Sequence, residues 1–276
     1  MAVHSEQRFD HVVIVGGGNM GLALAAGFAS SAAARVTVVD PAPERVRERL
    51  PAGSAIVVVD TPEAIESVPG MIVLAVKPAL VPVVLADYRR HVDAGALVVS
   101  IAAGVTRGTI RSHLGPDARV IRAMPNTPAL VGQGMTVLYG GTGLPEADRL
   151  AAEGFFGAVG STAWVDREEL IDAATAVSGS GPAYVFAFAE HLAAAGMTVG
   201  LTAELATELA RTTLAGAVAL LNQPDAEAAA LKRAVCSPRG TTEAGLSVLE
   251  GKPGLAELLE GTVRAAHARA VELSRG

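Results

Sequence analysis

The segment Gly-Gly-Gly-Asn-Met-Gly at 16–21 most strongly limits how this chain can fold. It follows a β-branched apolar run at 11–15, which predicts a buried strand, and it precedes small residues that favour helix. Its spacing fits G-x-G-x-x-G, in which Gly16 allows a tight turn, Gly18 admits a pyrophosphate and Gly21 lets helix and strand pack closely. The free N–H groups of the helix start would face the phosphates. The segment predicts a dinucleotide-binding loop, with a glycine-rich turn that binds nothing as the alternative.

Short apolar runs alternate with helical patterns through the first half of the chain. Predicted strands lie at 11–15, 35–39, 56–59, 71–76, 96–102 and 119–123, with closing strands at 134–139 and 162–165. Predicted helices lie at 19–30, 44–50, 106–114 and 146–156, and Thr61-Pro62-Glu63 has the N-cap, proline and acid of a further helix start. This alternation predicts an α/β domain of the Rossmann type, with a mostly parallel sheet covered by helices on both faces.

The pattern changes after Asp166, where no further strand is predicted. Helical patterns occupy 168–177, 183–195, 202–221, 226–234 and 255–273. The chain is therefore divided into a sheet domain at 1–166 and an all-helical domain at 167–276. The second domain is short and alanine-rich, so it has few large side chains to bury its own apolar surface. Pairing with a second copy of the chain would cover that surface, and the alternative is a helical lid packed only on its own sheet.

Composition excludes several other classes of protein. The net charge is -6 and the 22 basic residues form no run, which argues against a nucleic-acid surface. The uncharged stretch at 12–34 is interrupted by three glycines and Asn19, so we expect no membrane span. The single Cys236, the polar segment at 1–10 and six histidines without ligand spacing predict a cytoplasmic protein with no metal site.

Polar residues follow three of the predicted strands. Asp40 lies 24 residues after Gly16, where an acid usually binds the adenosine ribose 2′-hydroxyl and favours NADH, although Arg45 could offset its charge. The alternative is an Asp that caps the helix after Pro41. Lys77 ends the strand at 71–76 and would face phosphate or nicotinamide, or be an ordinary surface lysine. Asn126, in Met-Pro-Asn-Thr-Pro at 124–128, lies in a rigid polar turn, with a structural Asx-type turn as the alternative.

Two serine- and glycine-containing loops interrupt the helical half. The sequences are Ser-Gly-Ser-Gly-Pro at 178–182 and Ser-Pro-Arg-Gly-Thr-Thr at 237–242. The first predicts an anion cradle or a helix N-cap, and the second offers hydroxyl and N–H donors for a carboxylate. Ordinary helix-start loops are the alternative for both. We find no Ser–His–Asp set and no paired carboxylates, which suits hydride transfer because the cofactor carries the difficult chemical step.

With these motifs in order, the chain resembles pyrroline-5-carboxylate reductases from about Asp10 to Glu272. The resemblance rests on the glycine segment, on Ala-Val-Lys-Pro at 75–78, on Met-Pro-Asn-Thr-Pro at 124–128, and on Ser-Gly-Ser-Gly-Pro-Ala-Tyr at 178–184 with Ser-Pro-Arg-Gly-Thr-Thr at 237–242. It implies a Rossmann domain followed by a helical dimerisation domain, with active sites at the dimer interface and dimers that often assemble into decamers. It also implies reduction of a cyclic imino acid to proline by NADPH or NADH.

The resemblance also implies roles for individual residues. The segments that match the family's cofactor contacts are Gly18–Met20, Val76–Pro78 and Ala102–Ala103. Together with residues taken from the motifs above, they give the predicted cofactor-binding set: Gly16, Gly18, Asn19, Met20, Gly21, Asp40, Val76, Lys77, Pro78, Ala102, Ala103 and Asn126. The substrate-binding set is Ser178, Ser237, Gly240, Thr241 and Thr242, with Thr242 near the ring nitrogen as the catalytic residue.

Two residues depart from the family pattern. Arg239 replaces the usual glycine of Ser-Pro-Gly-Gly, and if that position needs a positive φ the arginine costs about 1–2 kcal/mol. Otherwise Arg239 points away, or it pairs with the substrate carboxylate or changes the substrate. Asp40 departs from members that prefer NADPH. Arg239 keeps one alternative open, a reductase of another cyclic imine such as a piperideine carboxylate. A second alternative, from another class, is a regulatory protein that only senses the redox state of a bound nucleotide, and the intact loops of the second half argue against it.

Overall fold

One eight-stranded sheet occupies the first half of the chain within residues 10–31 and 35–275, which the computed structural model describes. Its strands are β1 (His11–Val15), β2 (Arg35–Val39), β3 (Val57–Val59), β4 (Met71–Leu74), β5 (Leu97–Ser100), β6 (Val120–Met124), β7 (Gly134–Tyr139) and β8 (Gly160–Trp164). The order is β3-β2-β1-β4-β5-β6-β7-β8, and only β6 and β7 pair antiparallel. The predicted mostly parallel sheet is confirmed. The segment 1–9 and residues 32–34 of the uncharged stretch lie outside the described residues.

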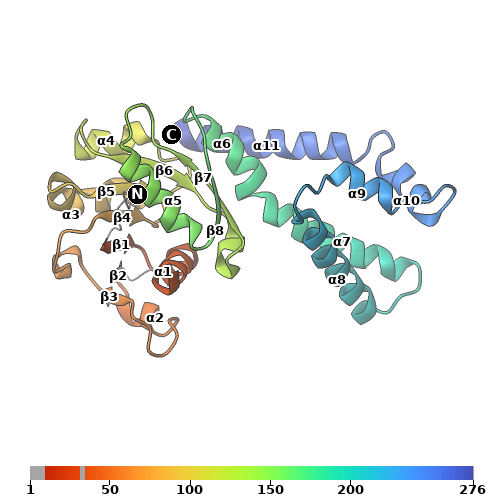
Figure 1. Cartoon of the computed structure of the whole chain (residues 1–276), viewed down its shortest axis with the longest axis horizontal. Helices are drawn as coiled ribbons and strands as arrows, with labels where there is room; N and C mark the ends of the chain where they lie inside the picture. The colour runs from red at the N-terminus through yellow and green to blue at the C-terminus, as the bar shows by residue number, and fades with distance from the viewer. Residues whose placement is uncertain (1–9, 32–34, 276) are drawn as a thin grey trace, which may run out of the picture. The chain divides into compact units, whose positions relative to one another are not determined.

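Helices cover both faces of this sheet because its strands bury alternate side chains on opposite sides (Figure 1). On one face, Val12 and Ile14 share a core with α1 (Asn19–Ser31), α2 (Pro43–Arg47) and α5 (Glu146–Gly157). On the other face, Val13 and Val15 share a core with α3 (Val81–Asp93) and α4 (Arg107–Leu114). Both faces are therefore buried, as an α/β fold of the Rossmann type requires.

One prediction is wrong in the segment after β3. The proposed helix start at Thr61 is a single 3-10 turn, η1 (Pro62–Ala64), and the Thr61 side chain makes no capping hydrogen bond. Ile65 ends the turn because it is extended, and its side chain is buried in the core on the α3 face. The same region holds a helix that the sequence patterns did not predict, since α3 begins with Val81-Pro82-Val83-Val84, residues of low helix propensity.

The chain after β8 is helical throughout the described residues, as predicted. Its helices are α6 (Leu170–Ala174), α7 (Gly181–Thr198), α8 (Ala203–Leu221), α9 (Ala228–Ala234), α10 (Thr241–Leu249) and α11 (Leu255–Arg275). The helix predicted at 168–177 is instead α6 followed by a π-helical turn, η4 (Thr175–Gly179). Ser180 occupies the N-cap position of α7, within the predicted loop, but its side chain makes no capping hydrogen bond. Helix α10 was not predicted.

The chain forms two compact units. We call residues 1–179 with 266–276 the sheet unit, and Ser180–Ala265 the helical unit. The sequence-based boundary at 166/167 follows the last strand, whereas the sheet unit also takes in α6, η4 and the end of α11. No described helix is long and apolar enough to cross a membrane, and no described His, Cys, Asp and Glu residues cluster as a metal site would require.

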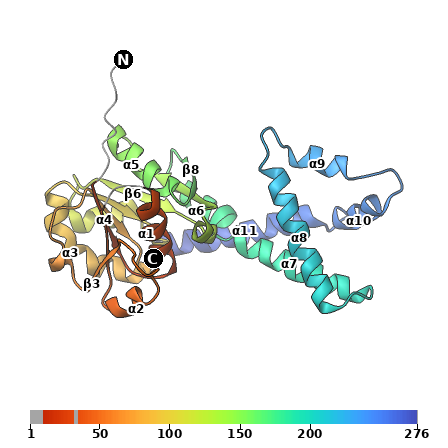
Figure 2. The same ribbon diagram turned by 60° about the horizontal axis from the view of Figure 1, so that its bottom comes forward.

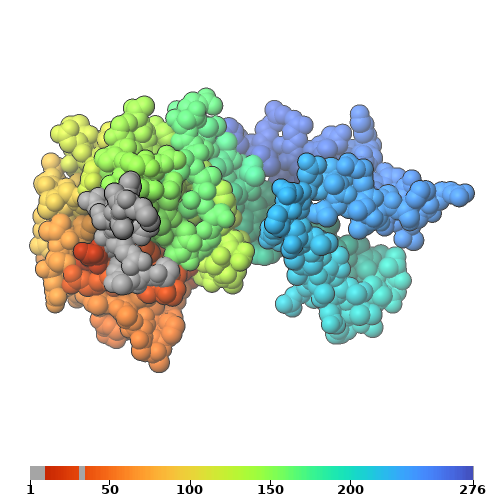
Figure 3. Space-filling model, in the orientation of Figure 1, coloured from red at the N-terminus to blue at the C-terminus, as the bar shows by residue number. Residues whose placement is uncertain are grey.

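The helical unit buries little of its own apolar surface. Helices α7 and α8 pack side by side as a hairpin (Figure 2), and Gly196 and Ala206 allow their close approach. Ala206 and Ala210 are the only described residues of the unit that are fully buried. Figure 3 shows α8, in teal, at the surface of the helical unit that faces the viewer. Large exposed apolar side chains of the unit include Val185, Phe186, Phe188, Val199, Leu205, Leu209, Val218 and Leu220.

Candidate active site

The glycine loop between β1 and α1 meets the steric demands of its motif. Gly16 has a φ of 105°, and a Cβ on it would lie 2.7 Å from the carbonyl oxygen of Ala75. A Cβ on Gly21 would lie 2.1 Å from the carbonyl oxygen of Gly16. Gly18 is different, because a Cβ there would meet nothing within 4 Å and would point into open space. Two glycines therefore serve the fold, while the third leaves room beside the first turn of α1.

Asp40 and Arg49 hold this loop from its two sides. The carboxylate of Asp40 accepts the N–H of Gly17 at 2.8 Å and the N–H of Ala42 at 2.9 Å. The Arg49 guanidinium donates to the carbonyl oxygen of Gly17 at 3.0 Å and to Oδ1 of Asn19 at 2.7 Å. Asp40 thus closes a local turn and orders the glycine loop, and each carboxylate oxygen keeps a second lone pair. Arg49, and not the predicted Arg45, is the basic residue with hydrogen bonds to the loop.

The ends of β4 and β5 lie at the same edge of the sheet as the glycine loop, because β4 pairs with both β1 and β5 in parallel. Val76 lies against Gly16, and Lys77 is exposed just before η2 (Pro78–Leu80). After β5, the N–H of Ala102 donates to the Ser100 hydroxyl at 3.3 Å. The carboxyl edge of a parallel sheet is where ligands bind in folds of this class.

Asn126 and Ser178 are joined to each other. Oδ1 of Asn126 accepts the N–H of Met135 at 2.8 Å, and its Nδ2 donates to the carbonyl oxygen and the hydroxyl of Ser178 at 3.2 and 3.3 Å. Asn126 does not cap η3 (Thr127–Val131), so the Asx-type turn expected as an alternative is wrong. The side chain instead connects the end of β6, the start of β7 and the π-helical turn η4.

The loop at 237–242 leads directly into α10. The N–H of Gly240 donates to the carbonyl oxygen of Ser237 at 2.9 Å, and a Cβ on Gly240 would lie 2.3 Å from the Ser237 hydroxyl. Glycine is therefore required at 240 by close packing. Gly240 is the N-cap of α10, so Thr241 and Thr242 occupy its first turn, where backbone N–H groups have no partner within the helix. This loop belongs to the helical unit and the glycine loop to the sheet unit.

Arg239 is in the left-handed region, with a φ of 60°. Its backbone N–H donates to a carboxylate oxygen of Glu243, which lies in the first turn of α10. The backbone cost expected for a non-glycine residue here is therefore present, since left-handed geometry costs about 1–2 kcal/mol. Glu243 was not among the predicted site residues, although an acid three residues after an N-cap is a known signal. Arg49 was also missed, and no sequence signal distinguishes it from Arg45 or Arg47.

Two family models match the chain. One, described as NADP oxidoreductase coenzyme F420-dependent, matches residues 11–104, and the other, Pyrroline-5-carboxylate reductase dimerisation, matches residues 168–273. A pyrroline-5-carboxylate reductase of Pseudomonas aeruginosa is 36% identical over 265 residues, which cover 95% of this chain and 96% of that relative. The chain belongs to the pyrroline-5-carboxylate reductase family.

Other members of the pyrroline-5-carboxylate reductase family agree with this assignment. The enzyme of Arabidopsis thaliana is 38% identical over 218 residues, covering 79% of this chain and 78% of the relative. The solved structure of a pyrroline-5-carboxylate reductase from Coxiella burnetii has a TM-score of 0.90 at 32% identity, covering 97% of this chain and 99% of that one. The Plasmodium falciparum enzyme, solved with NADP bound, has a TM-score of 0.80 at 28% identity, covering 98% and 99%.

Proposed function

We propose that this chain reduces the C=N bond of 1-pyrroline-5-carboxylate to give L-proline, with NADPH or NADH as the reductant. The observation that carries this proposal is the relationship to pyrroline-5-carboxylate reductases across 95% of the chain, which includes both loops described above. As a member of this family, the chain is an NAD(P)H-dependent oxidoreductase that acts on a C=N bond.

The sheet unit would hold the dinucleotide. Gly18 leaves open space beside the first turn of α1, where the N–H groups of Asn19 and Met20 are available to a pyrophosphate. Val76, Lys77 and Pro78 after β4, and Ala102 and Ala103 after β5, would lie along the nicotinamide half. The reduced nicotinamide supplies a hydride when bound. The protein's own part is to bind it, orient it and exclude water.

The helical unit would hold the substrate carboxylate. Ser237 and Thr241 offer hydroxyls, Gly240 brings the backbone close, and the first N–H groups of α10 attract an anion. Thr242 would donate to, or protonate, the ring nitrogen, while Ser178 would contact the substrate from η4. The hydride adds to C5 of the C=N bond, the π electrons move to the nitrogen, and the nitrogen ends as the secondary amine of proline. Because a protonated imine is already electrophilic, positioning provides most of the rate enhancement.

Cofactor choice is proposed to favour NADH. Asp40 ends β2, and its carboxylate would accept the ribose 2′-hydroxyl and repel a 2′-phosphate. The exposed guanidinium of Arg49, which is tied to the same loop, would reduce that repulsion, so use of both cofactors is expected. The test is turnover of pyrroline-5-carboxylate with NADH and NADPH in parallel. A strong preference for NADPH would contradict the role given to Asp40.

Thr242 provides the most direct test of the mechanism. Thr242→Ala should lower kcat/KM for the imine by roughly ten- to a thousandfold, because one positioned donor to the reacting nitrogen is lost. Thr242→Ser, which keeps the hydroxyl, should recover most of that loss. An unchanged kcat/KM in Thr242→Ala would exclude the proposed role.

A six-membered imine is the second candidate substrate. The observation that favours it is Arg239, a charged side chain at a strained position of the carboxylate loop. Turnover of pyrroline-5-carboxylate and a piperideine carboxylate side by side would separate the two. Absence of NAD(P)H oxidation with either imine would instead favour a regulatory role without catalysis.

Self-association is supported by the match to the dimerisation family model over residues 168–273. We propose a homodimer as the smallest unit, with assembly into a decamer and a cytoplasmic location as further expectations. Light scattering across a concentration series would give the mass of the assembly. The domain boundary at 166/167 stays a prediction.

A further inference from the structure

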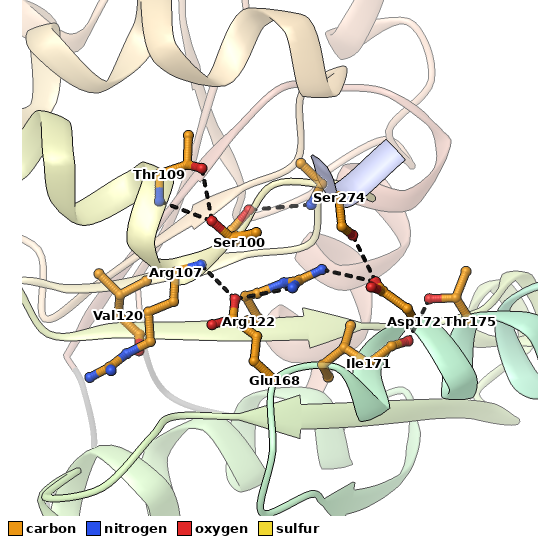
Figure 4. Close-up of polar contacts among 12 residues, drawn as sticks. Ser100, Arg107, Thr109, Val120, Arg122, Glu168, Ile171, Asp172, Thr175 and Ser274 are labelled. Carbon is orange, nitrogen blue, oxygen red and sulfur yellow. Dashed lines mark hydrogen bonds and ion pairs between the residues drawn. The ribbon is translucent and has the colours of Figure 1, made fainter. Parts of the chain in front are cut away.

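A buried charged cluster joins β6, α6 and the end of α11 (Figure 4). Arg122, in the middle of β6, is 3% exposed, and its guanidinium lies 3.0 Å from Glu168 and 3.5 Å from Asp172. Glu168 also accepts the backbone N–H of Arg107 at 2.7 Å, at the start of α4. Removing one partner of such a buried ion pair leaves the other charged and desolvated, which is costly. The cluster therefore fixes α6 and the start of α4 on the sheet.

The same cluster also holds the last turn of α11. The hydroxyl of Ser274 donates to Oδ1 of Asp172 at 2.8 Å, across 102 positions of sequence. This is the carboxylate oxygen that faces Arg122, so Asp172 connects the guanidinium to the last turn of α11. Hydrogen bonds to a charged group are the stronger kind, and little water competes for an acceptor this buried.

The residue before Ser274 touches the loop after β5. Gly104 has a φ of 76°, and a Cβ on it would lie 2.5 Å from the carbonyl oxygen of Leu273 and 3.0 Å from its Cβ. The backbone of α11 is thus packed directly on the backbone of Gly104. Any shift of Leu273 would move Gly104 or open a gap beside it.

Gly104 follows Ala102 and Ala103, the segment proposed to contact the nicotinamide half of the cofactor. Ala103 packs against the small core that contains Met124 and Ile171, and Ile171 is the neighbour of Asp172 on α6. The segment 102–104 is therefore held between α6 and the last turn of α11. Asp172 and Ser274 join these two supports to each other.

We propose that Asp172 and Ser274 are positioning residues for dinucleotide binding, acting through the contact of Leu273 with Gly104. This inference rests on the proposed function, because it assumes that the segment 102–104 contacts the cofactor. It predicts that the Ser274 hydroxyl, which touches neither cofactor nor substrate, affects the affinity for the dinucleotide more than that for the imine.

The experiment compares Ser274→Ala with Ser112→Ala in the full chain. Ser112 is a matched control, because the residue is exposed and the partners of its hydroxyl, the Thr109 carbonyl oxygen at 2.7 Å and Nδ1 of His113 at 3.2 Å, both belong to its own helix, α4. Titration calorimetry with NADH and NADPH should show a Kd that rises roughly three- to thirtyfold in Ser274→Ala and stays unchanged in Ser112→Ala. The KM for the imine should change by less than about twofold in both variants.

Two further variants separate positioning from simple loss of structure. Ser274→Thr keeps the hydroxyl and should restore the dinucleotide Kd, whereas Asp172→Asn keeps the acceptor oxygen but removes the charge facing Arg122. The asparagine variant should therefore lose thermal stability in addition to affinity. A dinucleotide Kd equal to that of the wild type in Ser274→Ala overturns the inference, as does an equal loss of affinity for both substrates. Wild-type protein that binds the dinucleotide but reduces no imine would overturn the proposed function alone.

Discussion

The sheet unit and the helical unit solve the problem of a hydrophobic core in different ways. The sheet unit buries large side chains such as Tyr88, Phe155 and Phe156 on both faces of its sheet. The described residues of the helical unit bury only Ala206 and Ala210 completely, and Phe186 is 66% exposed. Exposed apolar patches of this kind mark interaction surfaces. The first unit therefore buries a core of its own, whereas the second exposes an apolar surface, in keeping with its match to a dimerisation model.

The largest predicted effect is on self-association, from a charge placed on the exposed face of α7. Phe186→Glu should weaken self-association by about a hundredfold or more, because a charge replaces an aromatic side chain that the second copy of the chain would bury. Sedimentation or light scattering measures the mass, and activity should fall with it. Val83→Glu on α3, at a similarly exposed position of the sheet unit, is the control and should leave the assembly intact. An unchanged assembly in Phe186→Glu would show that the partner covers another face.

In the sheet unit, the glycine loop allows a test of which glycine serves the fold and which faces the ligand. Gly16→Ala combines a positive φ with a clash against Ala75, so it should lower both thermal stability and dinucleotide affinity, the latter by tens of fold. Gly18→Ala meets no protein atom, so its melting temperature should match the wild type while the dinucleotide KM rises about tenfold. Equal melting curves for both variants would contradict this division between a structural and a ligand-facing glycine.

Arg239 tests whether the helical unit carries strain of its own. Arg239→Gly should stabilise the protein by about 1 kcal/mol, because the left-handed φ then has no steric cost. Chemical denaturation with the assembly held intact measures this change. Arg239→Ala removes the guanidinium but keeps the strain. Weaker substrate binding in both variants would indicate a salt link to the carboxylate, and unchanged binding would show that the side chain points away.

The smallest predicted effect is the pH dependence of stability, which arises from a histidine in the core of the sheet unit. Burial, and then the nearby charge of Arg35, lowers the pKa of His11 below its ordinary value of 6.5. The unfolded chain therefore takes up a proton at a pH where the folded chain does not, so stability is complete above about pH 6.5 and falls as the pH drops below it. Melting temperatures from pH 7.5 to 5.5 should show this fall, with a shallower slope in His11→Gln. An identical slope would exclude His11 as the cause.

Much of the sheet unit could be predicted because its signals are local. A β-branched run followed by glycines and small residues specifies β1, the loop and α1 within a single window. Helix α3 was missed for the opposite reason, since its Val-Pro-Val-Val start has low helix propensity and its buried face decides the structure. Only the packing of Leu85, Tyr88 and Val92 against the sheet makes that segment helical.

The candidate site was predicted as a set of segments, but not as a set of contacts. The sequence placed Asp40 after β2, yet nothing local shows that its carboxylate accepts the N–H of Gly17. Asp172 pairs with Arg122 and accepts a hydrogen bond from Ser274, and these three positions lie far apart in the chain, so no pattern within a window reveals the contacts. The one available signal was Arg122, a charged residue within the apolar strand β6. Such a residue indicates a buried partner but does not show which residue that partner is.

The last turns of α11 belong to the sheet unit, although they follow the whole helical unit in the chain. During synthesis the ribosome must therefore complete the helical unit before the segment that packs on Gly104 and Asp172 emerges. At rates of about 5–20 residues per second this delay is roughly 4–17 s. Over that interval the nascent sheet unit would hold Asp172 without its Ser274 partner. We expect the dinucleotide-binding edge to reach its final form only after the last turn of α11 has emerged from the ribosome.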